Sequence, residues 1–180
     1  MPLAMAVDSS VLSPFARAGK LEVLHQLTAE RRCVVPLAVL REIDAGVAEY
    51  PRLAEVRGTS WLEAVPTDSF DELRVTSLYL ADLGTDDESR NVGEATTLAW
   101  AEVHGAVALV DDALAVAFGR KRGCTVVRTL RLITNALGAL GDADASLLVD
   151  ALVRDGGARF PCDGAGFIAW AENQGLVVRG

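Results

Sequence analysis

Short apolar runs alternate along the chain with segments of helical periodicity, and this alternation constrains the fold more than any other feature. The runs are residues 4–7 (AMAV), 33–36 (CVVP), 107–110 (VALV) and 124–127 (CTVV), and residues 61–65 (WLEAV) alternate like a strand edge. Strands separated by helices form parallel sheets with helices on both faces. We therefore predict an α/β fold with three layers, in which helices flank a central parallel sheet.

The segments between these runs predict the helices. Ser9 and Ser10 are good N-cap residues for the pattern that continues to Leu27. Further patterns predict helices over about 37–48, 68–81, 94–104 and 113–122, and from about 130. The polar segment 84–93 is a loop by composition. Two more patterns, 145–154 and 164–174 with Asp144 and Asp163 as caps, form a C-terminal helical extension. We expect residues 1–140 to be one domain and 141–180 to pack on it in a structural role.

Composition excludes several classes of protein. No apolar run approaches the roughly 18 residues that cross a bilayer, and the N-terminus lacks the basic and apolar regions of a signal peptide, so we expect a cytoplasmic protein without a membrane partner. The three cysteines are far apart and are read as reduced, buried thiols. His25 and His104 have no partners at the spacing of zinc ligands.

The formal net charge of −8 argues against a general nucleic-acid coat, which would be basic. One local cluster is nevertheless basic: Arg120, Lys121, Arg122, Arg128 and Arg131. Either it is a solvated helix end and loop, or it contacts a phosphate backbone or an acidic partner. Arg90, in the polar loop, is a further candidate for a phosphate contact.

Acidic residues follow or flank the predicted strands. Asp8 ends the first run, Asp111 and Asp112 end the run at 107–110, and Glu42 and Glu94 lie in neighbouring helices. Ligands of parallel sheets gather at the carboxyl ends of the strands. Two carboxylates about 4 Å apart repel by roughly 4 kcal/mol at an effective dielectric near 20, so such a cluster favours a bound cation. Carboxylate oxygens suit Mg²⁺ or Mn²⁺, and such an ion indicates phosphodiester hydrolysis.

Each acid also has a structural interpretation. Asp8 and one of Asp111 and Asp112 are candidate helix caps, Glu94 in a first helical turn is favoured by the helix dipole, and Glu42 is a candidate solvated residue. The acids at 86–88 are read as a solvated loop. Trp100 and Trp170, spaced helically among Leu and Ala, are read as core.

The segments VDSSVL (7–12), PLAVLREI (36–43), VGEATTLAWAEVHGAVALVDDALA (92–115) and VVRTLRLI (126–133), in this order, resemble the PIN-domain nucleases. The Gly-Glu-Ala motif resembles the VapC-like toxin branch. The resemblance implies metal-binding acids at Asp8, Glu42, Glu94 and Asp112, with Asp111 able to share the role, and a hydroxyl at Ser9 or Ser10. The chain departs from many relatives at residues 113–115, which are apolar, and at position 94, where many have Asp.

The sequence thus predicts a metal-dependent endoribonuclease using Mg²⁺ or Mn²⁺. The resemblance implies the toxin of a toxin–antitoxin pair, with an antitoxin partner and a homodimer as possible assemblies. The alternative is a catalytically silent PIN fold that binds protein or RNA. A phosphatase of the haloacid-dehalogenase type is disfavoured, because VDSS lacks the second Asp two residues after the first.

Overall fold

A parallel sheet forms the centre of the molecule. The computed structural model describes residues 3–29, 31–84 and 91–177. Within these residues, five strands pair in the order β3-β2-β1-β4-β5, and every pairing is parallel. The strands are β1 (Met5–Val7), β2 (Cys33–Pro36), β3 (Leu62–Val65), β4 (Val107–Leu109) and β5 (Thr125–Val127). The predicted α/β class and the predicted parallel sheet are confirmed.

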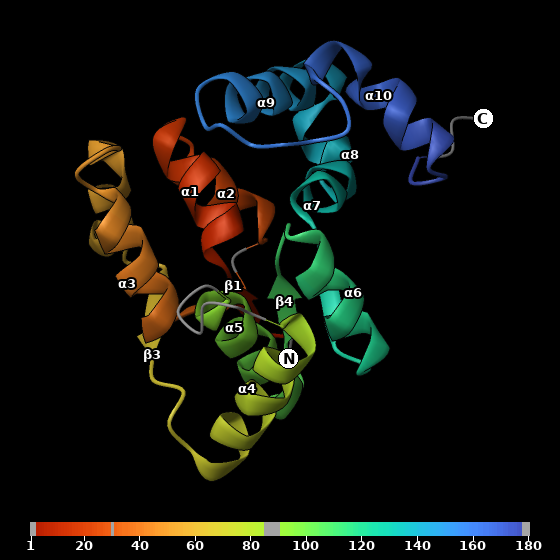
Figure 1. Cartoon of the computed structure of the whole chain (residues 1–180). Coiled ribbons are helices and arrows are strands. Elements are labelled where there is room, and N and C mark those ends of the chain that lie inside the picture. Colours follow the sequence, from red (N-terminus) through yellow and green to blue (C-terminus); the bar gives the residue numbers. More distant parts are fainter. Residues whose placement is uncertain (1–2, 30, 85–90, 178–180) are drawn as a thin grey trace.

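Helices connect the strands and cover both faces of the sheet (Figure 1). They are α1 (Ser9–Arg17), α2 (Leu21–Leu27), α3 (Leu37–Gly46), the 3₁₀ helix η1 (Pro51–Gly58), α4 (Phe70–Leu83), α5 (Val92–Val103), α6 (Ala113–Lys121), α7 (Thr129–Asn135), α8 (Leu137–Leu140), α9 (Asp142–Arg154) and α10 (Gly164–Asn173). Helices α9 and α10 lie in the C-terminal segment 141–180, and α9 packs against α1 (Figure 1).

Successive strand residues point to opposite faces of the sheet and so enter two separate cores. Met5 and Val7 join the core made with α1, α2, α3, η1, α7, α9 and α10. Ala6, Val34 and Ala108 join the core made with α4, α5 and α6. Because both faces of β1, β2 and β4 are covered, these strands need no polar side, which explains why their sequences are uniformly apolar.

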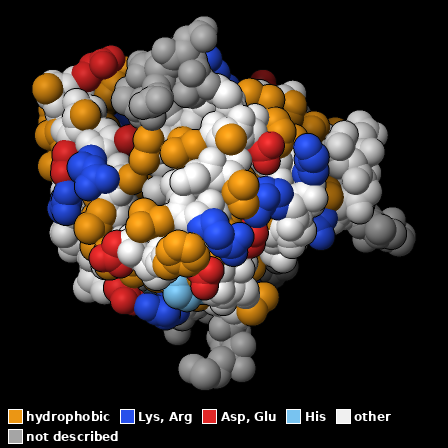
Figure 2. Space-filling view, turned by 60° about the horizontal axis from the view of Figure 1, so that its bottom comes forward, with side chains coloured by type: hydrophobic (Ala, Val, Ile, Leu, Met, Phe, Trp, Pro, Cys, Tyr) orange, Lys and Arg blue, Asp and Glu red, His pale blue; other side chains and the backbone are white. Residues whose placement is uncertain are grey.

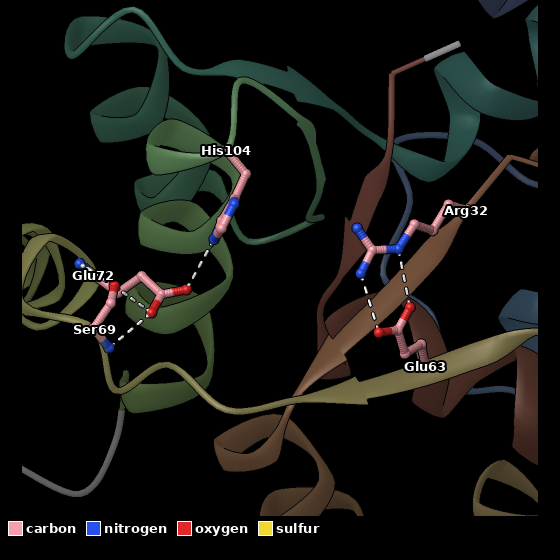
Figure 3. Close-up of polar contacts among 5 residues, drawn as sticks. All are labelled: Arg32, Glu63, Ser69, Glu72 and His104. Atoms are coloured by element: carbon pink, nitrogen blue, oxygen red, sulfur yellow. Dashed lines mark hydrogen bonds and ion pairs between the residues drawn. The ribbon is translucent and has the colours of Figure 1, made fainter. Parts of the chain in front are cut away.

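Two polar contacts fix the edge of the sheet and the helix pair α4–α5 (Figure 3). Arg32 donates two hydrogen bonds to the Glu63 carboxylate on β3, with N–O distances of 2.9 and 3.0 Å. Ser69 and Glu72 form a capping box at the start of α4, and the ring Nε2 of His104, at the end of α5, lies 3.0 Å from Glu72 Oε1. Burial raises the pKa of Glu72, but hydrogen bonds from Ser69 and His104 outweigh it and hold that pKa below its ordinary value.

The face brought forward in Figure 2 mixes apolar side chains with charges of both signs. Although the net charge is −8, the acidic side chains do not form one continuous patch on that face. In the part of the chain that the structure describes, no helix is long and apolar enough to cross a membrane.

Several local predictions are wrong in detail. The first helical pattern breaks into α1 and α2 at Gly19, whose φ of +66° is a left-handed conformation that favours glycine. The N-cap of α1 is Asp8, not Ser9 or Ser10. Gly141 precedes α9, so Asp144 lies in its first turn and is not its cap, whereas Asp163 caps α10 as predicted. Neither η1 nor α8 was predicted.

Candidate active site

The sheet reverses its order between β1 and β4, and the predicted acids lie at the carboxyl ends of these two strands. From β1 the chain moves to β2 and β3 on one side, and β4 and β5 lie on the other. Such a reversal leaves a crevice between the outgoing connections, where α/β proteins bind ligands. Asp8 follows β1 directly, and its backbone N–H donates to the carbonyl of Leu109 on β4 at 3.1 Å.

Asp8 is a fully buried carboxylate with one unpartnered oxygen. Its Oδ2 accepts a hydrogen bond from the Ser10 backbone N–H at 2.8 Å, which caps α1. Its Oδ1 is buried and has no hydrogen-bond partner among the described residues. Burial raises the pKa of Asp8 to about 6, against the lowering effect of the Ser10 hydrogen bonds and with a smaller rise from the charge of Glu42. A buried carboxylate oxygen without a partner is costly, so it favours a proton or a cation.

Glu42 connects three helices. The Ser9 hydroxyl of α1 donates to its Oε2, and the Gly93 backbone N–H of α5 donates to its Oε1, both at 2.8 Å. A Cβ at position 93 would lie 2.5 Å from the Glu42 carboxylate oxygens. The glycine of the Gly-Glu-Ala motif is therefore required for this close approach, and Glu42 is not the solvated residue of the structural interpretation.

Glu94 is half-buried in the first turn of α5. Burial and then the charge of Asp8 raise its pKa to about 7, and the charges of Glu42 and Asp112 add to the rise. The charges of Asp8, Glu42 and Asp112 thus act on Glu94 from three other parts of the fold. The joint role of Asp8, Glu42, Glu94 and Asp112 as metal-binding acids stays a prediction.

The acids after β4 both accept a backbone N–H at the start of a helix. Asp112 is exposed and its Oδ1 accepts from the Ala115 N–H at 2.8 Å, which caps α6. Asp111 is tied to α7, because its Oδ1 accepts from the Thr129 N–H at 2.8 Å. Burial raises the pKa of Asp111, although the Thr129 hydrogen bond and the charge of Arg128 oppose the rise. Asp112 is among the charges that raise the pKa of Glu94, whereas Asp111 is not.

A cavity of about 580 Å³ opens beside these acids. Its charged lining residues are Glu94, Asp111, Asp112, Arg17, Arg128 and Arg159. Ser9 and Ser10 also line it, but their hydroxyls are engaged: Ser9 donates to Glu42, and Ser10 Oγ accepts from the Asp111 N–H at 3.0 Å. These serines position the acids. Arg90 lies outside the described residues.

The donor set suits a hard divalent cation. Among the residues that the structure describes, no three Asp, Glu, His or Cys side chains are placed where they could hold a metal ion together. Mg²⁺ needs no such group, because it keeps several waters and binds through one or two carboxylates. Asp8 has an unpartnered Oδ1 and Glu94 has a raised pKa. These are the two carboxylates whose negative charge a bound cation would neutralise.

Arg128 was predicted only as a member of the basic cluster. Its contact with the chain after β4 was not predicted. Its Nη2 donates to the Asp111 carbonyl oxygen at 3.0 Å, which fixes the chain after β4 to the chain after β5. Its place directly after the strand at 124–127 was the available signal.

Fold and site together define a doubly wound α/β protein with an acidic site at its topological switch point. The chain belongs to the PIN-domain family (DUF3368), whose profile matches residues 4–161. No curated protein matches it significantly. Among solved structures, it is similar to a chain of VapBC2 from Rickettsia felis bound to a DNA fragment from their promoter, at 12% identity and a TM-score of 0.51, over 70% of this chain and 98% of that chain.

Proposed function

We propose that this PIN-domain protein is a metal-dependent endoribonuclease that hydrolyses RNA phosphodiester bonds. The observation that carries the proposal is the buried, unpartnered Oδ1 of Asp8, coupled by charge to Glu94 at the switch point of the sheet. A structural cap would use Asp8 Oδ2 alone and would not require a second acid beside it. This arrangement is the one expected of a site that binds a cation.

The acids have different roles in this proposal. In this proposal Asp8 and Glu94 hold Mg²⁺ or Mn²⁺, Asp112 adds its charge beside them, and Asp111 accepts the Thr129 N–H at the start of α7. Glu42 keeps its hydrogen bonds to Ser9 and Gly93, and its charge raises the pKa of Asp8 and of Glu94. A bound ion would supply a water of lowered pKa and positive charge for the phosphate oxygens. Arg128 and Arg159 line the same cavity and attract the RNA backbone.

We further propose that the nuclease is a toxin controlled by an antitoxin, and that it forms a homodimer. The order of the sequence motifs and the Gly-Glu-Ala motif support the VapC-like assignment. The similarity to VapBC2 supports the fold on which that assignment depends. Growth arrest on expression of the chain alone, relieved by a small protein encoded beside it, would test the toxin role.

A catalytically silent PIN fold is the second candidate. It is favoured by the commitment of Asp111 and Asp112 to backbone N–H groups at helix starts and of both Glu42 oxygens to hydrogen bonds. In that case the acids would only organise the ends of the helices, and the cavity would bind RNA or protein without cleaving it.

Cleavage of RNA by the purified protein separates the two candidates. The wild type should cleave single-stranded RNA with Mn²⁺ and not with EDTA. The Asp8→Asn variant keeps an oxygen that can cap α1 but loses the charge, so it should fold and show only the rate seen without metal. Asp68→Asn, an exposed residue before α4, is the matched control and should cleave like the wild type. Equal activity of wild type and Asp8→Asn would refute the nuclease proposal.

A further inference from the structure

A second cavity, of about 490 Å³, lies between the PIN core and the C-terminal extension. The elements around it are α6, the β5–α7 connection, the segment before α10, and α10 itself, on the right side of Figure 1. Its main polar lining is the guanidinium groups of Arg120, Arg128 and Arg131, and its aromatic lining is Phe160 and Trp170. Trp170, which was interpreted as core from the sequence, packs against the buried core but is only half-buried and also borders the cavity.

The cavity is electropositive in a protein of net charge −8. No carboxylate in the described part of the chain forms an ion pair with Arg120 or Arg131. The guanidinium of Arg128 donates to the Asp111 carbonyl oxygen and stays exposed. Arg128 is also ion-paired with Asp111, with 4.0 Å between its Nε and Asp111 Oδ1, whereas Arg120 and Arg131 have no such partner among the described residues. Arginines without an acidic partner attract an anion, and their planar groups suit phosphate oxygens.

The aromatic side chains indicate which class of anionic ligand the cavity binds. Single-stranded nucleic acids are bound where a positive groove follows the backbone and aromatic rings stack on the bases. An acidic peptide would use the arginines but would gain little from Phe160 and Trp170. The volume falls within the roughly 300–1,000 Å³ of small-ligand pockets and accommodates one nucleotide.

The second cavity adjoins the cavity beside the acids. Asp111, Arg128 and Phe160 line both cavities. A strand whose phosphate lies beside Asp8 and Glu94 would therefore pass Arg128 and reach the second cavity with its next nucleotide. The C-terminal extension supplies Trp170, so it contributes to binding as well as to packing.

We propose that this cavity is a nucleotide subsite that holds one base of the RNA strand next to the cleaved phosphate. The base lies against Trp170 and Phe160, and the phosphate lies at Arg128 and Arg131. The inference rests on the proposed ribonuclease function for its substrate, and its tests measure binding separately from cleavage.

The first test measures binding of a labelled short single-stranded RNA by anisotropy in EDTA, so that no cleavage occurs. Trp170→Leu should weaken binding about tenfold or more, as expected for loss of a stacked base. Arg131→Gln should weaken binding and make it less dependent on salt. Arg31→Gln is the matched control, since Arg31 is exposed and precedes β2, which lies on the other side of β1 from β4 and β5. RNA binding by both cavity variants equal to that of the wild type and of Arg31→Gln would overturn the proposal.

The second test uses the fluorescence of Trp170. Nucleoside 5′-monophosphates should quench the fluorescence of the wild type, whereas inorganic phosphate at equal concentration should not. Trp170→Phe keeps an aromatic ring and should keep RNA affinity within a few-fold, but its remaining tryptophans, Trp61 and Trp100, should not be quenched. Quenching that persists in Trp170→Phe, or equal competition for RNA by phosphate and mononucleotides, contradicts base stacking. Displacement by an oligoglutamate peptide but not by mononucleotides would indicate a peptide site and overturn the proposal.

Cleavage with Mn²⁺ distinguishes failure of the subsite from failure of the nuclease proposal. If the wild type cleaves RNA and Trp170→Leu raises KM with little change in kcat, both proposals stand. If the cavity variants cleave with wild-type KM, the subsite is wrong and the nuclease proposal stands. If the wild type binds RNA through Trp170 but never cleaves it, the nuclease proposal is wrong and the subsite stands.

Discussion

The Glu42 carboxylate lies directly against the backbone of Gly93, which donates its N–H to Glu42 Oε1 at 2.8 Å. The two residues are 51 positions apart and bring α3 to the start of α5. Because Glu94 is the next residue, the position of its carboxylate depends on this contact. Glycine stands at the first position of the Gly-Glu-Ala motif in this chain because a side chain there would collide with the Glu42 carboxylate.

Gly93→Ala should destabilise the protein and disturb the site. The added Cβ would lie 2.5 Å from Glu42 Oε1, so Glu42 must move and give up the hydrogen bond from the N–H of residue 93. Overpacking of this kind costs about 1–3 kcal/mol. For a chain of this size that is roughly a 2–12 °C fall in Tm, measured by thermal denaturation. Gly138→Ala in α8 is the control, since a Cβ there meets nothing within 4 Å. An unchanged Tm for Gly93→Ala would show that Glu42 is free to move away.

The site residues were predictable because strand ends are readable from sequence. Asp8 and Asp112 follow short apolar runs, and the carboxyl ends of parallel strands share an edge. The hydrogen-bond partners of these site residues could not be predicted from the sequence. Whether Glu42 bonds Ser9 or water depends on how α3 packs on α1, a contact between residues 33 positions apart. Trp170 shows the same limit, because helical spacing identifies an apolar face but does not show that the neighbouring side chains leave a cavity beside it.

Without metal, the protein should lose stability as pH rises from about 4 to about 7. The pKa of Asp8 is raised from 3.8 to about 6, and that of Glu94 from 4.5 to about 7. In this interval the folded protein retains protons that the unfolded chain has released, so the free energy of unfolding falls with pH. Urea denaturation in EDTA at about pH 5 and about pH 8 measures the difference.

The matched control for this pH dependence is the double variant Asp8→Asn/Glu94→Gln, which keeps the shape of both side chains without their charge. Its stability should change less between the two pH values than that of the wild type. A wild type that is more stable at the higher pH in EDTA would show that the two carboxylates are not held in mutual repulsion.

Phe167→Ala should lower the stability of the whole chain and leave a single unfolding transition. Phe167, on α10, is fully buried in the same core as Met5 of β1 and Val11 of α1. Large-to-small changes of a buried Phe cost about 3–5 kcal/mol. Calorimetry should show one transition at lower temperature. Two transitions, with only the first displaced, would mean that residues 141–180 unfold as a separate unit.

Asp112 is both the N-cap of α6 and a charge that raises the pKa of Glu94, and two substitutions separate these roles. Asn is as good an N-cap as Asp, so Asp112→Asn should keep the Ala115 hydrogen bond and remove only the charge. In EDTA, this variant should be as stable as the wild type or more stable. Asp112→Ala should lose about 1 kcal/mol with the cap, with or without metal.

Millimolar Mn²⁺ completes the comparison for Asp112. An ion that binds only the folded state stabilises it by RT ln(1 + c/Kd), where c is the concentration of the free ion. The wild type should therefore gain Tm on addition of Mn²⁺, and Asp112→Asn should gain less and lose RNA cleavage. If Mn²⁺ does not raise the Tm of the wild type and Asp112→Asn is clearly less stable in EDTA, the carboxylate serves α6 alone. The metal site would then have to be built from Asp8 and Glu94 without it.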